Sequence, residues 1–203
     1  GIWALKTLDI RDFAVDRHKT VDSSPYGGGP GMVLRPDVLD RALEAVSDVP
    51  GRRICLSPRG RRFDQAFAKE LAHEPGVVLV CGRYEGIDQR VIEAREMEEV
   101  SLGDFVLTGG EIAAQALLDA TVRLLPGAIG SEQGLNEESF EDGLLEYPQY
   151  THPKIWEGRS VPEVLLSGNH KKIAEWKKQQ SELATRNFRP DLWEAYEGVK
   201  VQT

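Results

Sequence analysis

Three glycine-bearing loops carry the residues whose types and spacing suggest chemistry. The segment VVLVCGRYEG (77–86) runs from an apolar stretch into a loop that holds a cation, an aromatic ring and an acid between two glycines. The other two loops are SLGDFVLTGGE (101–111) and YGGGPGM (26–32). None of them contains GxGxxG or GxxxxGK[ST], so they lack the spacing of the common dinucleotide and triphosphate sites.

Glycine lets a backbone approach a ligand closely or adopt a positive φ. In the loop 101–111, Leu102 and Leu107 would wall a site in which main-chain N–H and C=O groups make most of the contacts. Such a site suits an adenine ring and a sulfonium better than a triphosphate, because no lysine is placed for phosphates. Two plainer interpretations stay open. The segment 101–111 could be a purely structural strand between turns, and 26–32 could be a flexible linker.

These loops need a scaffold, and the hydrophobic pattern predicts a mostly parallel sheet. Strands that run into Gly or Pro loops are predicted at Arg53–Ser57, Val77–Cys81 and Phe105–Leu107. Apolar residues recur at helical spacing in 37–47, 62–73 and 111–125. Strands that alternate with helices form βαβ units, in which ligands bind beyond the carboxyl ends of the strands. The loops after the three strands are therefore expected to meet at that edge.

The composition indicates a folded protein of one large domain, or of one domain with an appendage. The chain has 203 residues, of which 40% are hydrophobic, and a net charge of −8. The longest apolar run, Val77–Cys81, is far shorter than the ~20 residues of a membrane helix, and no secretory signal is visible. Cys55 and Cys81 lie in apolar runs and are predicted to be buried, reduced thiols of a cytoplasmic protein. The four histidines show no metal-ligand spacing.

The last third of the chain is predicted to be an acidic linker followed by helices. Residues 131–146 contain six acids and no Lys or Arg, whereas 147–203 contain nine Lys or Arg against seven acids. Ser160 and Glu163 fit a capping box, and Asn169 fits the N-cap of a longer helix. One side of that helix is predicted to carry Ile173, Trp176, Gln180 and Leu183, and the opposite side Lys171, Lys172, Lys177 and Lys178. Such a lysine run is most often a solvated face.

Eight segments occur in an order that is highly specific, although any one glycine loop is weak evidence. The segments are RDF (11–13), DRHKTVD (16–22), YGGGPGM (26–32), LSPRGRRFDQ (56–65), CGRYEGIDQRV (81–91), EEVSLGDFVLTGGE (98–111), YPQYTHP (147–153) and VPEVLLSGNH (161–170). They closely resemble the bacterial tRNA (guanine-N1)-methyltransferases of the SPOUT superfamily. The resemblance runs from about residue 1 to about residue 193, without a large gap.

The resemblance implies methyl transfer from S-adenosylmethionine to ring nitrogen 1 of guanine 37 of tRNA, beside the anticodon, where a guanine precedes that base. It implies a cytoplasmic homodimer with active sites at the subunit interface, and Mg²⁺ is a candidate for activity without a protein metal site. The implied fold is α/β, with a parallel sheet, helices on both faces and a deep trefoil knot that holds the cofactor. Family members usually begin with a further strand and a helix carrying an FPE motif, which this sequence does not show.

The implied domains are a catalytic domain at 1–129, a linker at 130–146 and a helical tRNA-binding domain at 147–203. Carried over position by position, the cofactor residues are Leu56, Ser57, Pro58, Gly82, Arg83, Tyr84, Glu85, Ser101, Leu102, Gly103, Asp104, Phe105, Val106, Leu107, Gly109 and Gly110. For Arg83, an ion pair with Glu85 or Asp88 is the structural alternative. The tRNA residues are Tyr26, Gly27, Gly28, Gly29, Pro30 and Gly31 near the target base, with Lys177, Lys178 and Arg186 on phosphates.

The chemistry calls for an acid–arginine pair. Ring nitrogen 1 of guanine carries a proton at neutral pH, so methylation needs a base at the nitrogen and a cation near the carbonyl oxygen that gains charge. The resemblance assigns Glu138 as the base, where the family has Asp, and Arg123 as the cation. Asp119, one helical turn earlier, is an alternative partner for Arg123, and Glu137 or Glu141 could replace the base. A non-catalytic RNA- or nucleotide-binding module of the same fold is the competing hypothesis, but it would lose this pair.

Overall fold

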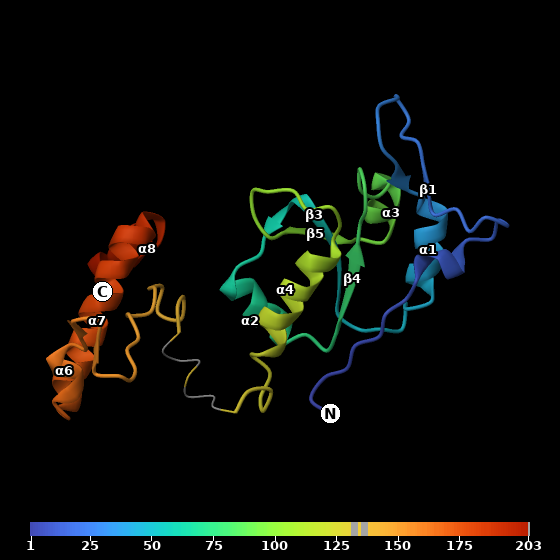
Figure 1. Cartoon of the computed structure of the whole chain (residues 1–203). Coiled ribbons are helices and arrows are strands. Elements are labelled where there is room, and N and C mark those ends of the chain that lie inside the picture. The colour runs from blue at the N-terminus through green and yellow to red at the C-terminus, as the bar shows by residue number, and fades with distance from the viewer. Residues whose placement is uncertain (131–133, 135–137, 203) are drawn as a thin grey trace. The chain divides into compact units, whose positions relative to one another are not determined.

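The computed structural model describes residues 1–130, 134 and 138–202, and the chain divides into two compact units. Unit 1 is Gly1–Gly130 and unit 2 is Ser131–Thr203. Figure 1 shows the whole chain. The roles predicted for the catalytic domain, the linker and the tRNA-binding domain stay predictions.

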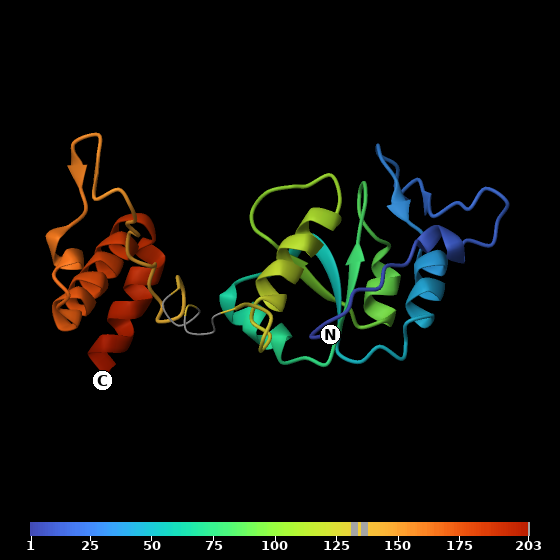
Figure 2. The ribbon, with the colours of Figure 1, turned by 60° about the horizontal axis from the view of Figure 1, so that its bottom comes forward.

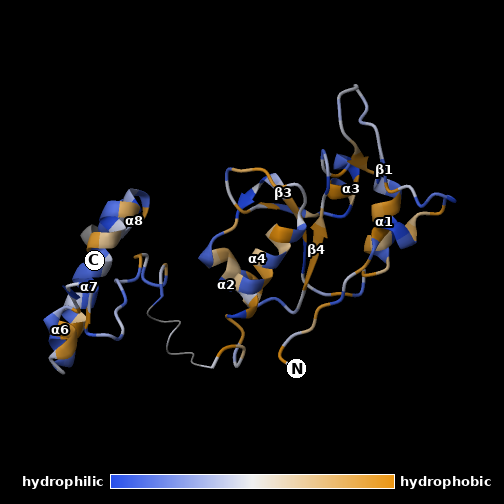
Figure 3. Ribbon diagram, in the orientation of Figure 1, coloured by the Kyte–Doolittle hydropathy of each residue, from blue (hydrophilic) through white to orange (hydrophobic). Residues whose placement is uncertain are grey.

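A three-stranded parallel sheet forms the centre of unit 1. Strand β3 (Arg52–Arg62) lies between β4 (Val77–Cys81) and β5 (Glu98–Ser101). The pairing of β3 with β4 is unbroken over five residue pairs. Strand β4 is apolar along its whole length (Figure 3), as expected for a strand of a parallel sheet that is covered on both faces.

Helices cover both faces of this sheet (Figure 1). The helices are α2 (Gln65–Ala72) and α4 (Glu111–Val122) on one face, and α1 (Pro36–Glu44) and α3 (Gln89–Ala94) on the other. Successive side chains of β3 alternate between the two faces. Ile54 packs with Phe67 of α2 and Leu117 of α4, whereas Cys55 packs with Leu39 of α1 and Val91 of α3. The predicted α/β fold with a parallel sheet and helices on both faces is confirmed, and the knot stays a prediction.

Two of the predicted loop and strand assignments are wrong. Residues 105–107 form no strand. The third strand of the sheet is β5, which ends earlier, at Ser101. Glu98 and Glu99 gave β5 a polar sequence, but both carboxylates are paired: Glu98 with Arg52 of β3, and Glu99 with Arg59. The Pro-Gly segment expected to leave the sheet after Ser57 instead lies inside β3, as a break in register.

Small elements extend unit 1 at its amino-terminal end. They are the 3₁₀ helix η1 (Ile10–Phe13) and the antiparallel pair β1 (Asp22–Ser23) and β2 (Val33–Leu34). This pair brackets the glycine loop 26–32, so that β2 fixes the loop at its carboxyl end. Leu34 forms an isolated parallel bridge with Ile87, which joins β2 to the segment that follows β4.

Side-chain caps define the starts of two helices beside the sheet. Asp64 Oδ1 accepts a hydrogen bond from the N–H of Phe67 at 2.8 Å, and α2 begins at the next residue after Asp64. Asp88 Oδ1 accepts from the N–H of Arg90 at 3.0 Å at the start of α3. The Arg90 guanidinium also pairs with Asp88 and holds the pKa of that carboxyl below its usual value.

Unit 2 is mainly helical. Its elements are the hairpin β6 (Ile155–Trp156) and β7 (Arg159–Ser160), followed by α6 (Glu163–Leu166), α7 (His170–Phe188) and α8 (Pro190–Gln202). Helices α7 and α8 pack against each other, and the hairpin projects from them (Figure 2). Asn169 Oδ1 accepts from the N–H of Lys172 at 3.1 Å, so the predicted cap of α7 is confirmed.

Two predictions about these helices are wrong. Ser160 does not cap α6, because it lies in β7 and the helix begins after Pro162 without a side-chain cap. Leu183 is half exposed, whereas Ser181 and Thr185 are buried. The inner face of α7 therefore contains small polar residues that a search for apolar periodicity passes over. Among the residues described, no helix combines the length and apolar character needed to cross a membrane.

Candidate active site

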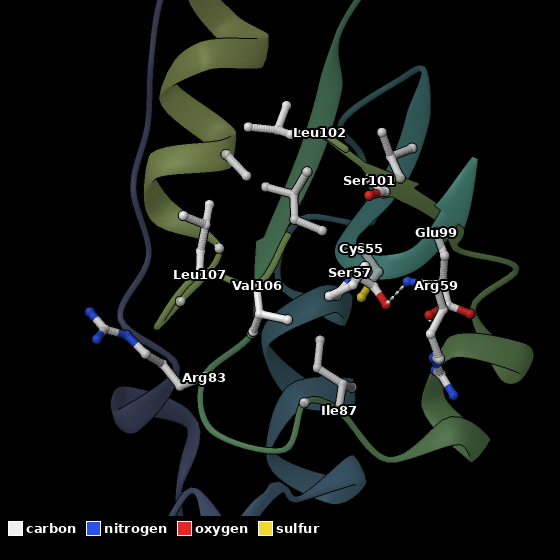
Figure 4. A pocket seen from close by; sticks show the side chains of 18 of the residues that line it. Cys55, Ser57, Arg59, Arg83, Ile87, Glu99, Ser101, Leu102, Val106 and Leu107 are labelled. Carbon is white, nitrogen blue, oxygen red and sulfur yellow. Dashed lines mark hydrogen bonds and ion pairs between the residues drawn. The ribbon is translucent and has the colours of Figure 1, made fainter. Parts of the chain in front are cut away.

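A cavity of about 360 Å³ lies in unit 1 where residues 55–59, at the register break of β3, meet the segments that follow β4 and β5. Its volume falls in the range of small-molecule pockets, and it lies at the carboxyl edge of the sheet, where the βαβ pattern predicts a site. No lysine lines it among the residues described. Figure 4 shows Leu102, Val106 and Leu107 along one side, and Cys55, Ser57, Arg59 and Glu99 along the other.

The start of α4 meets the end of β4 through a backbone contact that only glycine permits. Gly110 N–H donates to the carbonyl of Gly82 at 2.9 Å. A Cβ at Gly110 would lie 2.8 Å from Cys81 Cα and 3.2 Å from Gly82 N. Both neighbours are backbone atoms of the strand end, so neither can swing away. The two loops therefore close one wall of the cavity with main-chain atoms, as the sequence predicts for a site of this kind.

An ion pair links the same two loops. Arg83 Nη2 lies 2.8 Å from Glu111 Oε1, and the backbones of Arg83 and Gly109 form an isolated antiparallel bridge. The alternative partners predicted for Arg83 are wrong, because Asp88 pairs with Arg90 instead and Arg83 reaches across to α4. Arg83 extends to the side, away from Cys55 and Ser57 (Figure 4), so it lies at the cavity rim.

The loop after β5 begins with a side-chain turn. Ser101 is buried, and its Oγ accepts from the N–H of Gly103 at 3.2 Å and donates to the carbonyl of the same residue at 3.1 Å. This arrangement turns the chain over the cavity immediately after the strand. Further along, Phe105 and Val106 are 55% and 83% exposed, although both line the cavity. Their exposure leaves an apolar surface beside the cavity.

The glycine loop 26–32 reaches the cavity rim through its last residues. The carbonyl of Met32 accepts from the N–H of Glu85 at 3.0 Å, and a Cβ at Gly31 would meet the side chain of Glu85. Tyr26, at the other end of the loop, is almost wholly exposed. The loop is thus brought next to the GRYEG segment.

Both cysteines are free thiols. Burial raises the pKa of the Cys55 thiol to about 11, and burial also raises the pKa of Cys81. Neither is therefore ionised near neutral pH. Within the described ranges, no group of three or more His, Cys, Asp or Glu side chains could hold a metal ion.

Comparison with known proteins identifies the family. The model of the family "tRNA (Guanine-1)-methyltransferase TrmD" matches residues 1–195. This chain belongs to the TrmD family. It is 62% identical over 196 residues to the tRNA (guanine-N(1)-)-methyltransferase of Rhodopseudomonas palustris strain HaA2, with 96% of this chain and 78% of the relative covered. It is 58% identical over 201 residues to the enzyme of that name from Rhodospirillum rubrum, with 99% and 84% covered.

A third TrmD relative shows the same extent of similarity. The tRNA (guanine-N(1)-)-methyltransferase of Bartonella quintana is 58% identical over 203 residues, which cover all of this chain and 87% of the relative. Similarity at this level covers both units and not the glycine loops alone.

The residues predicted to bind the TrmD cofactor lie around the cavity with one exception. Asp104 is exposed and is not among the lining residues, whereas all the other residues of the predicted set are. The lining also includes residues that the sequence did not single out: Cys55, Arg59, Gly86, Ile87, Ile92, Glu99, Val100, Thr108 and Ala113. Several of these belong to the strands themselves, and alternation along β3 could have identified Cys55. The cofactor-binding roles of the predicted set stay predictions.

The two residues predicted to be catalytic belong to different units. Arg123 is the C-cap of α4 in unit 1, and its N–H donates to the carbonyl of Asp119 at 3.2 Å. Glu138 opens the segment 138–146 of unit 2, which we call the acidic loop. Glu137, the predicted substitute, lies outside the described residues.

The predicted phosphate contacts all lie on α7 of unit 2. Lys178 and Arg186 are exposed. Lys177 is half-buried, and its Nζ lies 4.5 Å from the centroid of the Tyr147 ring. Of these three cations, Lys177 thus contacts the segment directly after the acidic loop.

Proposed function

We propose that this TrmD-family chain transfers the methyl group of S-adenosylmethionine to ring nitrogen 1 of guanine 37 in tRNA that has a guanine before that position. The observation that carries the proposal is the family match over residues 1–195, which includes both units. The form of the cavity supports it. Main-chain groups and apolar side chains form much of its lining, beside the charged Arg59, Arg83, Glu85 and Glu99. Among the described residues it has no lysine for a triphosphate.

The chemistry of the lining fits the methyl donor. The glycine contact at Gly110 closes one wall of the cavity with backbone atoms, and Leu102 and Leu107 offer apolar walls for an adenine ring. When bound, S-adenosylmethionine supplies an electrophilic methyl group on its sulfonium. Glu85 and Arg83 lie at the rim, where they could bind the charged ends of its methionine part.

The chain itself must supply the acid–base chemistry. Glu138 removes the proton from ring nitrogen 1 of guanine, which makes the nitrogen a nucleophile. The negative charge then moves toward the neighbouring carbonyl oxygen of the base, and Arg123 stabilises it there. The glycine loop 26–32 is proposed to lie near the target base.

The assembly that we propose is a cytoplasmic homodimer with a knotted catalytic domain and active sites at the subunit interface. The exposed apolar side chains of Phe105, Val106 and Ile112 beside the cavity support a covered surface there. Mg²⁺ is proposed as a requirement of the reaction and not as a ligand of a protein site.

The decisive test uses the purified chain, radiolabelled S-adenosylmethionine and two tRNA transcripts. One transcript has guanine at positions 36 and 37, and the other has adenine at 37. Nucleoside analysis should find 1-methylguanosine only in the first. Binding of the cofactor and the tRNA without any methylated nucleoside would instead favour a non-catalytic binding module.

The contribution of α7 to tRNA binding can be measured separately. Replacing Lys177 and Lys178 together by alanine should weaken tRNA binding and reduce the slope of log K against log salt by up to about 2, because each phosphate contact contributes about one. Affinity for S-adenosylmethionine should stay unchanged. The matched control replaces both lysines by arginine, which keeps the charges and should keep the slope. An unchanged slope in the alanine variant would return these lysines to the solvated-face interpretation.

A further inference from the structure

The acidic loop is closed on itself by two hydrogen bonds. The N–H of Phe140 donates to the carbonyl of Leu144 at 2.7 Å. The N–H of Glu146 donates to Ser139 Oγ at 3.0 Å. The second bond joins the end of the loop to the residue next to Glu138. The position of Glu138 in unit 2 therefore depends on where the end of the loop is held.

One buried hydroxyl fastens that end to α7. Thr185 is 0% exposed. Its Oγ1 accepts from the N–H of Leu145 at 2.8 Å and donates to the carbonyl of Ser181, one turn earlier in the helix, at 2.7 Å. The hydroxyl thus serves as acceptor toward the loop and as donor toward its own helix. Without the Thr185 hydroxyl, the partly buried N–H of Leu145 would lose its hydrogen-bond acceptor, which would reduce the stability of the folded state.

Two further contacts hold the acidic loop against the carboxyl-terminal helices. Leu144 is buried, and the Arg189 guanidinium lies 6.0 Å from the centroid of the Phe140 ring. Arg189 in turn donates its N–H to the carbonyl of Thr185 at 2.8 Å. Thr185 is therefore connected to the loop directly through Leu145 and indirectly through Arg189.

Threonine is energetically unfavourable at this buried position in a helix unless its hydroxyl makes hydrogen bonds. β-Branched polar residues have low helix propensity, and a fully buried hydroxyl is unfavourable unless it is hydrogen-bonded. Valine has nearly the same shape and would fill the same space without a polar group. The geometry thus connects the hydroxyl to the loop rather than to the packing of α7.

We infer that Thr185 is a positioning residue for methyl transfer, because its hydroxyl fixes the acidic loop, and with it Glu138, to helix α7. The inference rests on the proposed role of Glu138 as the base. Helix α7 also carries Lys177 and Lys178, about two turns before Thr185, which is roughly 12 Å along the helix. The carboxylate of Glu138, through the acidic loop, and the proposed phosphate contacts are then both fixed to α7. A tRNA held by its phosphates would therefore meet the general base Glu138 at a fixed distance.

The test compares Thr185→Val, Thr185→Ser and the control Thr151→Val in the full chain. Thr151 is an exposed threonine of the same unit. The single-turnover rate constant of methyl transfer is measured at saturating S-adenosylmethionine and tRNA, together with both dissociation constants and the melting temperature. We expect Thr185→Val to lower the rate constant about 10–100-fold, the effect of a misplacement of about 1 Å, with both dissociation constants within about threefold of the parent. Thr185→Ser should restore most of the rate, and Thr151→Val should match the parent.

A double-mutant comparison separates this inference from the proposed function. If Thr185 acts through Glu138, Thr185→Val should have little further effect in a Glu138→Gln background. Equal rates for Thr185→Val and the parent, alongside a slow Glu138→Gln variant, would overturn the inference and leave the proposed base in place. A normal rate for Glu138→Gln would instead overturn the base assignment. A valine variant that loses tRNA affinity as much as rate, or that is not rescued by serine, would show a purely structural role. If Thr185→Val does not fold, Ser139→Ala breaks the other end of the same connection without altering α7.

Discussion

Replacing Glu138 by glutamine should lower the single-turnover rate of methyl transfer by about 10²–10⁴-fold, the usual contribution of a positioned acid–base group. Glutamine keeps the shape of the side chain but cannot accept the proton of ring nitrogen 1. Without proton removal the nitrogen lone pair is not available to the methyl group. Affinities for S-adenosylmethionine and tRNA should stay nearly unchanged, because the loss occurs in the chemical step and not in binding. Rapid-quench measurement at saturating substrates provides the rate.

The neighbouring acids provide the controls for this result. Glu138→Asp should keep most of the activity, because the carboxylate is retained. Glu141→Gln makes the same chemical change three residues later in the acidic loop and should leave the rate near that of the parent. A fast Glu138→Gln variant together with a slow Glu137→Gln variant would place the base one residue earlier.

Replacing Gly110 by alanine should weaken binding of S-adenosylmethionine about 10–100-fold. The new Cβ would lie 2.8 Å from Cys81 Cα, so the start of α4 must move away from the end of β4. Overpacking of this kind costs about 1–3 kcal/mol, and about 1.4 kcal/mol corresponds to tenfold in affinity. Because the wall that moves is formed by main-chain atoms, side-chain rearrangement cannot absorb the change. Titration calorimetry measures the affinity, and circular dichroism checks that the variant is folded.

Other glycines of unit 1 give a graded comparison. At Gly109 a Cβ would meet the ends of the Arg83 and Glu111 side chains, which can move, so alanine there should have a smaller effect. At Gly130 no atom lies within 4 Å of the Cβ position, and alanine should have none. A folded Gly110→Ala variant with unchanged affinity would place the cofactor elsewhere.

The sequence predicted the layers of unit 1 well because short apolar runs and helical spacing report burial directly. It failed at β5, since Glu98 and Glu99 make this strand polar. Their partners, Arg52 and Arg59, come from β3, more than thirty-five residues earlier in the chain. Pairing over such a distance leaves no local pattern. The hydrophobic pattern also placed Phe105 in a strand, although it lies in an exposed loop.

The residues around the candidate site were predictable to different degrees. Glycine loops are visible in a sequence, so most of the residues that line the cavity could be named from their motifs. The partner of Arg83 could not be predicted, because Glu111 is 28 residues later in the chain, at the start of α4, whereas Arg83 lies in the loop after β4. Thr185 was hidden for a different reason. The inner face of α7 is small and polar near its end, and the periodicity of apolar residues pointed to Leu183 instead.

The register break in β3 also determines which changes in chain length unit 1 can accept. Leu56 and Arg61 both lie opposite Val100 of β5, so the four residues between them form an excursion of fixed length. Gly60 passes so close to the backbone of β5 that a Cβ there would overlap it. Side chains in a strand alternate between faces, so deleting one residue would turn Arg61 away from the Phe67 ring, 4.3 Å from its guanidinium. Insertions and deletions are therefore expected to be excluded from this short stretch, even though it is rich in residues typical of tolerant surface loops.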